Sequence, residues 1–312
     1  MRAFVFPGQG SQAVGMGREL AESLPTAREV FEEVDDALGQ RLSRLMFEGP
    51  EAELVLTANA QPALMAVSVA AVRVLGRDAG VDLARACRFV AGHSLGEYSA
   101  LCAAGAIALA DVARLLRRRG QAMQEAVPVG VGAMAALLGL ELEQAREVVE
   151  KAAAGEVLDA ANDNAPGQVV VSGHRTAVER AIEVAKAHGA RRSILLPVSA
   201  PFHCRLMQPA AEAMQEALER VAVRSPAVPL VANVTASAVR EPDEIRRLLV
   251  EQVTGLVRWR ESVLYMQQAG VETLVELGAG KVLSGLTRRI DRDLAAISVG
   301  TPAEVDAFVK TL

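Results

Sequence analysis

The residues Gly92-His93-Ser94-Leu95-Gly96 have the spacing G-x-S-x-G, in which a serine between two glycines can act as a nucleophile. The apolar run 87–91 before them has strand character, and residues 97–104 after them are good helix formers. The flanking glycines suit a sharp strand-to-helix turn, which leaves no room for a Cβ beside the nucleophile. Such a turn holds the serine at a helix N-terminus, where free N–H groups favour developing negative charge. We therefore expect Ser94 to be an activated nucleophile.

An activated serine needs a general base, and His203 is the best candidate among the four histidines. It lies late in the chain, in the Pro-rich segment 197–204 before a predicted helix; the alternative is a solvated loop histidine. His93 occupies a variable position of the turn and is expected to point elsewhere, and His174 and His188 have the pattern of surface residues. No acidic residue stands out as a third member. This favours a Ser–His dyad whose imidazole is oriented by a backbone carbonyl or an amide.

An arginine on an apolar helix face is the clearest indication of the substrate. The stripe along the helix expected over 111–125 contains Val112, Leu115, Leu116, Arg119 and Met123. A guanidinium that faces inward keeps its charge and needs an anion. That anion is either a protein carboxylate in a buried pair or a substrate carboxylate, which arginine binds in bidentate fashion. We assign Arg119, and Met123 on the same stripe, to a substrate site.

The glycine-containing segment 8–12 follows a predicted strand and precedes a predicted helix. It matches the beginning of a dinucleotide-binding fingerprint, but no acidic residue ends a second strand about 20 residues later. A turn whose backbone N–H groups face a cleft fits better. The N–H of Gln9, paired with that of Leu95, could then form an oxyanion hole.

The elements that position these residues form an α/β pattern with one interruption. In the first 128 residues the expected elements are a strand over 2–6, helices near 16–24, 27–38 and 61–76, and the strand before Ser94. The order changes to βαββαβ, with elements at 131–138, 142–153, 157–161, 168–172, 177–187 and 191–196. The α/β pattern then resumes with elements at 205–221, 228–234, 242–253, 258–269, 272–277, 281–291 and 295–299.

We therefore predict a large α/β-hydrolase-like domain with a parallel sheet, formed by residues 1–128 and 197–312. A small ferredoxin-like domain of order βαββαβ, residues 129–196, interrupts it. The site is expected in the cleft between the two domains, because ligands usually bind in such clefts.

Composition excludes several function classes for this chain of 312 residues. A net charge of −5, 3% aromatic residues and the lack of a basic run argue against nucleic-acid binding. No apolar stretch approaches the roughly 18 to 20 residues that cross a bilayer, and the apolar part of Met1–Pro7 is short for a signal peptide. Three cysteines without C-x-x-C spacing indicate a reduced, cytoplasmic compartment. The histidines lack metal-binding spacing, so no metal is expected.

With these residues in place, the chain resembles the malonyl-CoA:acyl carrier protein transacylases of bacterial type II fatty-acid synthesis. The segments that carry the resemblance, in family order over almost the whole chain, are 6–12, 92–97, 119–120, 166–170 and 280–283. The resemblance implies a cytoplasmic acyltransferase that moves a malonyl group from malonyl-CoA to the phosphopantetheine thiol of acyl carrier protein. It also implies a ping-pong reaction through a malonyl-serine, no bound cofactor, and a monomer.

The same resemblance implies roles for the residues already singled out. Ser94 would be the acylated nucleophile, His203 the base, and Arg119 the group that binds the free malonyl carboxylate. Gln9 and Leu95 would supply the N–H groups of the oxyanion hole.

Four further residues enter through the resemblance. Gln252 would orient the histidine through its backbone carbonyl, although its spacing alone indicates an ordinary helix-end amide. Asn162 and Asn164 would line the cleft from the small domain, but they are equally typical of turns. Phe202 stands where many bacterial members have Ser. In related polyketide acyltransferases Phe at this place goes with malonyl, because an α-methyl group would crowd the ring, a discrimination of about 1–3 kcal/mol.

Three alternatives stay open beside this prediction. The first is a serine hydrolase or thioesterase acting on acyl-CoA, against which the inward Arg119 and the missing acidic partner argue. The second is an acyltransferase that serves polyketide synthesis, which the sequence does not distinguish from fatty-acid synthesis. The third is a non-enzymatic module that docks carrier protein, which the presence of nucleophile, base and anion-binding group makes the weakest.

Overall fold

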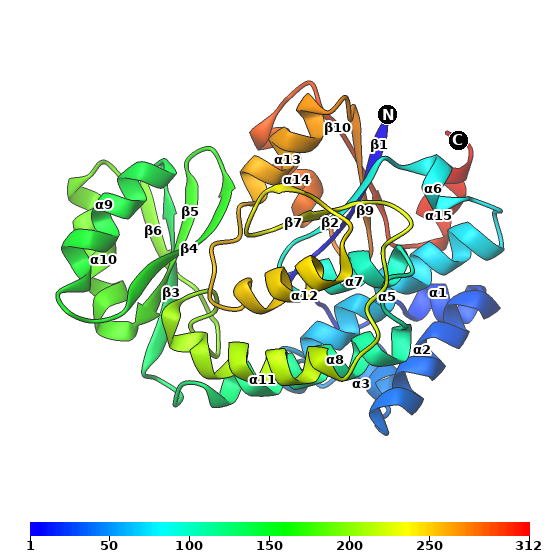
Figure 1. Ribbon diagram of the computed structural model, residues 1–312, viewed down its shortest axis with the longest axis horizontal. Helices are drawn as coiled ribbons and strands as arrows, with labels where there is room; N and C mark the ends of the chain where they lie inside the picture. The colour runs from blue at the N-terminus through cyan, green and yellow to red at the C-terminus, as the bar shows by residue number, and fades with distance from the viewer.

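A six-stranded sheet forms the centre of the larger part of the molecule (Figure 1). The computed structural model describes residues 1–312. The strand order is β10-β9-β1-β2-β7-β8, and all neighbours pair in parallel except β7 and β8. Its strands are β1 (Arg2–Phe6), β2 (Phe89–Gly92), β7 (Leu230–Ala232), β8 (Ser237–Val239), β9 (Thr273–Leu277) and β10 (Ala295–Val299).

Helices cover both faces of this sheet, because alternate residues of its strands point to opposite sides. In β1, Phe4 and Phe6 pack into the largest core cluster, which includes residues of α5 and α7, while Ala3 and Val5 pack with residues of α13 and α14. The helices before the small unit are α1 (Arg18–Ser23), α2 (Pro25–Leu38), α3 (Leu42–Glu48), α4 (Glu51–Leu54), α5 (Thr57–Arg77), α6 (Leu83–Ala86), α7 (Gly96–Ala103) and α8 (Leu109–Glu125). Those after it are the 3-10 turn Arg205–Met207, α11 (Gln208–Glu219), α12 (Pro242–Glu251), α13 (Trp259–Gln268), α14 (Val282–Ile290) and α15 (Pro302–Val309).

A separate antiparallel sheet forms the smaller part, drawn in green in Figure 1. Its order is β4-β5-β3-β6, and it packs with α9 and α10 around a core cluster of its own. The elements, in chain order, are β3 (Gly132–Leu138), α9 (Leu142–Ala153), β4 (Leu158–Ala165), β5 (Gln168–His174), α10 (Arg175–Ala187) and β6 (Arg192–Leu195). The mixed α/β fold class, with a largely parallel sheet and a second sheet, is thereby confirmed. The division after residues 128 and 196 stays a prediction.

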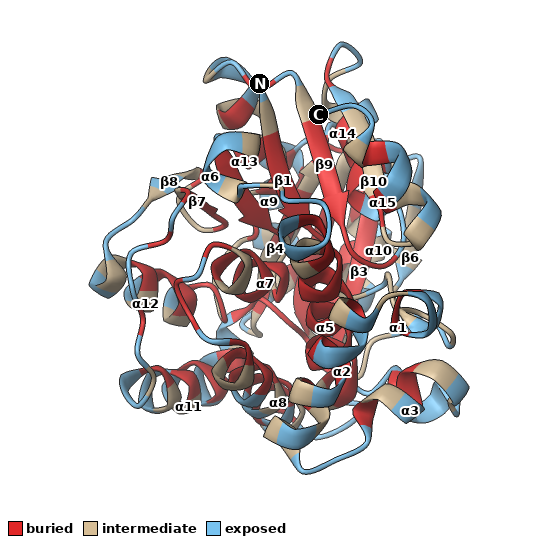
Figure 2. Ribbon diagram, turned by 90° about the vertical axis from the view of Figure 1, so that its right-hand side faces the viewer, coloured by how far each residue is buried: buried red, intermediate tan, exposed pale blue.

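Helix α5 runs through the core beneath the sheet, and most of its length is buried (Figure 2). By length and composition it could cross a membrane, so the expectation that no stretch is long and apolar enough was wrong. However, 78% of its most apolar stretch is buried inside the protein, as in a core helix. Gly120 on α8 lets the two helices meet closely, since a Cβ there would lie 2.5 Å from the Cα of Ala58.

Strand β4 differs most from the expected boundaries. It continues to Ala165 rather than ending near Ala161, so Asn162 and Asn164 lie in a strand instead of a turn. The segment Leu158–Ala165 is rich in Ala, Asn and Asp, which are depleted in strands, and its pairing with β5 is interrupted by two register shifts. A parallel bridge between Asn162 and Val257 attaches it to the larger part. Five short elements, α3, α4, α6, β8 and α15, were not anticipated.

Candidate active site

Ser94 lies on the predicted turn between β2 and α7, with a φ of 53° that non-glycine residues rarely adopt. The two flanking glycines are required by the close approach of backbone. A Cβ on Gly92 would lie 1.9 Å from the carbonyl carbon of Gly96, and one on Gly96 would lie 2.3 Å from the carbonyl oxygen of Phe6. The strained turn directs the Ser94 hydroxyl into a cavity instead of the core.

His203 meets this hydroxyl from the loop before α11. Its Nε2 lies 2.8 Å from Ser94 Oγ, and its Nδ1 lies 2.9 Å from the backbone oxygen of Gln252. Because a carbonyl oxygen only accepts, Nδ1 carries the proton and Nε2 is free to accept from Ser94. Burial, followed by the charge of Arg119, lowers the pKa of His203 to about 3, so the imidazole is neutral near neutral pH. The pair is a dyad oriented by a backbone carbonyl, as the sequence suggested.

Arg119 points inward from α8 and is 1% exposed. Its Nη1 donates to Gln61 Oε1 at 2.8 Å, and its Nη2 donates to Gln252 Oε1 at 2.7 Å and to Ser94 Oγ at 3.2 Å. Its Nε has no partner, and no carboxylate lies within ion-pair distance of the guanidinium. A buried protein salt bridge, the alternative left open by the sequence, is therefore absent. The site holds a cation beside the nucleophile that only neutral groups contact.

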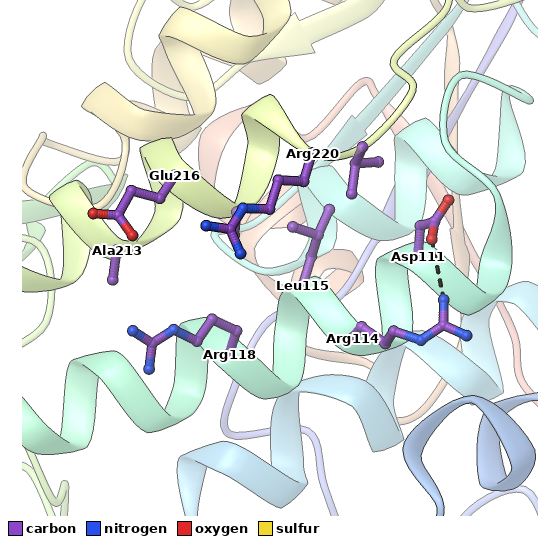
Figure 3. A pocket seen from close by; sticks show the side chains of 9 residues that line it. Asp111, Arg114, Leu115, Arg118, Ala213, Glu216 and Arg220 are labelled. Carbon is purple, nitrogen blue, oxygen red and sulfur yellow. Dashed lines mark hydrogen bonds and ion pairs between the residues drawn. The ribbon is translucent and has the colours of Figure 1, made fainter.

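The other arginines of α8 point away from Ser94. Figure 3 shows Arg114 turned toward Asp111 of its own helix, and both Arg114 and Arg118 line a hollow of about 320 Å³ between α8 and α11 that shares no lining residue with the cavity at Ser94. Arg117 donates to Asn59 Oδ1 at 2.6 Å. Arg119 is thus the one arginine of α8 that lies on the buried apolar face, whereas Arg114, Arg117 and Arg118 lie outside it.

The backbone N–H groups of Gln9 and Leu95 donate to no group within the protein. Both residues line the cavity at Ser94. The side chain of Gln9 is fixed to α5 by a 3.0 Å hydrogen bond from Thr57 Oγ1, which in turn accepts from Gln61 Nε2 at 2.9 Å. Unpaired amides on fixed segments are what an oxyanion hole requires.

A cavity of about 340 Å³ connects these groups between the two sheets. Nine of the ten predicted site residues line it, namely Gln9, Ser94, Leu95, Arg119, Met123, Asn162, Asn164, Phe202 and His203. The tenth, Gln252, is fully buried behind them and acts through the hydrogen bonds just described. His93 points toward the small sheet, where its Nε2 lies 2.8 Å from Asn164 Oδ1.

Sequence reasoning missed several residues of this site. Gln61 binds Arg119 directly, and its position as a polar residue four residues after Thr57 in a mostly apolar helix was a signal that could have identified it. Met134 and Val170 complete the wall on the side of the small sheet, where nothing distinguishes them from core residues. The roles assigned to the site residues stay predictions.

Comparison with known proteins agrees with this geometry. The acyl transferase domain family matches residues 3–298. A malonyl CoA-acyl carrier protein transacylase of Escherichia coli K12 is 48% identical over 99% of this chain and 98% of that protein. An acyl-carrier-protein S-malonyltransferase structure from Bartonella henselae is 56% identical, with a TM-score of 0.97 over 99% of this chain and 98% of that one. A malonyl-transacylase solved with its type II polyketide-synthase acyl carrier protein is 43% identical, with a TM-score of 0.96 over 100% of this chain and 99% of that one. A serine hydrogen-bonded to a buried histidine and a family match over nearly the full chain lead to one conclusion: the chain is an acyltransferase and belongs to the acyl transferase domain family.

Proposed function

We propose that this acyltransferase moves a malonyl group from malonyl-CoA to the phosphopantetheine thiol of an acyl carrier protein, through a malonyl ester on Ser94. Full-length relatives named as malonyl transacylases support the substrate class. The observation that carries the proposal is the buried Arg119 guanidinium, 3.2 Å from Ser94 Oγ and without a carboxylate partner. Among acyl groups, malonyl offers a free carboxylate for such a cation to bind.

In the first half-reaction His203 Nε2 takes the proton of Ser94 Oγ, and the oxygen attacks the thioester carbonyl carbon. The N–H groups of Gln9 and Leu95 hold the oxyanion of the tetrahedral intermediate. The carbon–sulfur bond then breaks, and the coenzyme A sulfur leaves with the proton from His203. The imidazolium formed in between keeps its orientation through the 2.9 Å hydrogen bond to the Gln252 carbonyl.

The second half-reaction repeats these steps with the carrier thiol as nucleophile. His203 takes the thiol proton, the sulfur attacks the ester carbonyl, and Ser94 Oγ leaves with the proton. Arg119 holds the malonyl carboxylate so that the ester carbonyl faces the oxyanion hole, which favours an incoming thiol over loosely placed water. Asn162, Asn164 and Met123 line the acyl site, and Phe202 limits space beside the malonyl α-carbon.

Finer features of the protein belong to the same proposal. The elements of the smaller part follow one another in the order βαββαβ, and its strands lie in the sheet in the order β4-β5-β3-β6. Both orders support a ferredoxin-like unit spanning residues 129–196. The serine turn on a parallel sheet supports a hydrolase-like large domain formed by 1–128 and 197–312. We further propose a cytoplasmic monomer that needs no metal or bound cofactor. Fatty-acid synthesis is the pathway that the relatives' name supports, and a polyketide carrier protein is the alternative.

Mass spectrometry of the intact protein after mixing with malonyl-CoA tests the proposal. We expect one malonyl adduct, located on Ser94 by peptide mapping, which disappears when phosphopantetheinylated carrier protein is added and reappears on that protein. Ser94→Ala should form no adduct. Ser99→Ala is the matched control, because Ser99 is a buried serine of α7 that does not line the cavity. Release of free malonate without transfer would instead indicate a hydrolase.

A further inference from the structure

A buried carboxyl group lies behind the serine turn and takes no part in the mechanism above. Glu97, in the first turn of α7, is 2% exposed. Its Oε1 accepts from the backbone N–H of Asn233 at 2.8 Å, and its Oε2 accepts from Gln252 Nε2. It forms no ion pair, although Arg119 is close enough for its charge to act on Glu97. Such a group is costly to bury and needs a reason.

The side-chain amide of Gln252 lies between this carboxyl group and Arg119. Its Nε2 donates to Glu97 Oε2 and to the backbone oxygen of Ser94 at 2.9 Å, while its Oε1 accepts from Arg119 Nη2 at 2.7 Å. Turning the amide over would place its NH₂ against the guanidinium donors and its oxygen against two acceptors. The orientation of Gln252 therefore decides whether Arg119 Nη2, the nitrogen beside Ser94, has an amide oxygen to donate to, while Gln61 holds Nη1.

We propose that Glu97 is a positioning residue for acyl-group selection: its carboxylate fixes the Gln252 amide, which holds the Arg119 guanidinium ready for the carboxylate of the acyl group. This inference rests on the proposed function, because it concerns how that site recognises malonyl. Glu97 does not touch the substrate. It acts through Gln252, whose backbone oxygen also orients His203.

The hydrogen-bond donors around position 97 explain why a carboxylate is needed there. Asn233 N–H is a fixed donor, and Gln252 must present its NH₂ on the other side, so residue 97 has to accept twice. A glutamine accepts with one atom and donates with the other. The NH₂ of a glutamine at position 97 would therefore meet another donor, either the Asn233 N–H or the Gln252 NH₂. In the second case the clash between the two NH₂ groups is removed only if the Gln252 amide turns over.

The ionised form of Glu97 is the one that accepts twice. Burial raises its pKa to about 7, although the hydrogen bonds from Asn233 and Gln252 and the charge of Arg119 oppose that rise. Assays at about pH 8 keep the carboxyl group mostly ionised in the wild type.

The test compares wild type, Glu97→Gln and Glu97→Asp in the first half-reaction, with malonyl-CoA and acetyl-CoA as separate substrates. We expect Glu97→Gln to lower kcat/KM for malonyl-CoA about tenfold more than for acetyl-CoA, mainly through KM, since only malonyl has a carboxylate for Arg119 to bind. Glu97→Asp keeps two acceptor oxygens and should retain more of the malonyl preference.

A role in packing alone predicts the opposite order, because Gln has the shape of Glu whereas Asp leaves a void. Parallel losses for both substrates, or a smaller malonyl preference in Glu97→Asp than in Glu97→Gln, would overturn the inference. If Glu97→Gln does not fold, a malonyl preference retained in Glu97→Asp supports the inference, and one lost there overturns it. A wild-type protein that forms no malonyl ester would instead overturn the proposed function itself, so the two failures are distinguishable.

Discussion

Replacing Arg119 with alanine should abolish the proposed preference for malonyl-CoA, so that malonyl and acetyl groups are treated alike. The guanidinium makes three hydrogen bonds in the free protein, to Gln61, Gln252 and Ser94. Their loss affects both substrates equally, because it precedes binding. Only malonyl brings a carboxylate that the buried cation can bind.

The difference between the substrates can be estimated from the burial of Arg119. A side chain that is 1% exposed pairs with a carboxylate in a site with little water, and removing one partner of a buried pair costs about 3–5 kcal/mol. At about 1.4 kcal/mol per tenfold, malonyl-CoA should lose roughly two to four orders of magnitude in kcat/KM beyond the loss for acetyl-CoA. Water entering the space left by the side chain brings the effect toward the lower limit.

Rapid-quench measurement of ester formation on Ser94 gives both kcat/KM values in one experiment. Arg119→Lys keeps the charge but loses the planar fork, so its malonyl preference should fall between those of wild type and Arg119→Ala. Arg118→Ala is the matched control, since that neighbouring side chain is 48% exposed and points away from the cavity. Equal losses for malonyl-CoA and acetyl-CoA in Arg119→Ala would refute the assignment of Arg119 to the acyl carboxylate.

Two further predictions concern the residues beside Arg119. Burial lowers the pKa of His203 from 6.5 to about 3, so between these values the unfolded chain binds a proton that the folded protein does not, and stability falls as the pH drops. Urea titrations of the wild type and of His203→Gln measure this effect. Between about pH 6 and 4 the wild type should lose about 1.4 kcal/mol more unfolding free energy per pH unit than the variant. Curves of unfolding free energy against pH that run parallel for the two proteins would contradict a buried neutral imidazole. Phe202→Ala should raise kcat/KM for methylmalonyl-CoA relative to malonyl-CoA by about 5- to 150-fold, the equivalent of 1–3 kcal/mol. An unchanged ratio would show that the ring does not limit the α-carbon.

The parts of the site that sequence could predict are those in which side-chain type and local geometry determine the outcome. Gly92 and Gly96 are needed because backbone occupies the place of a Cβ, and that requirement is visible as a motif. Arg119 was identified because a charged residue on an apolar stripe violates the helix pattern. In both cases the signal lies within a single element: a turn that only glycine can form, or a charged residue on an apolar helix face.

Other parts depend on contacts between distant elements and leave no such signal. The group that orients His203 is the backbone oxygen of Gln252, which any residue could supply, so its side chain carries no information about that role. Strand β4 extends past Ala161 through pairing with β5 and a bridge to Val257, against the propensity of its own residues. The positions of Asn162 and Asn164 in the cavity follow from that pairing. Resemblance indicated these residues where physical reading of the sequence did not.

The neutral partner of His203 follows from the presence of Arg119. An acidic third residue beside His203 would add a negative charge close to the guanidinium, because the charge of Arg119 already acts on His203. A carboxylate there would neutralise the cation and compete with the acyl carboxylate for it. A backbone carbonyl orients His203 without adding charge, and the amide of Gln252 holds Arg119 without pairing its charge. A site that must recognise an anion beside its nucleophile is therefore better served by a dyad than by a charged triad, and the one nearby carboxyl group, Glu97, stands on the far side of that amide.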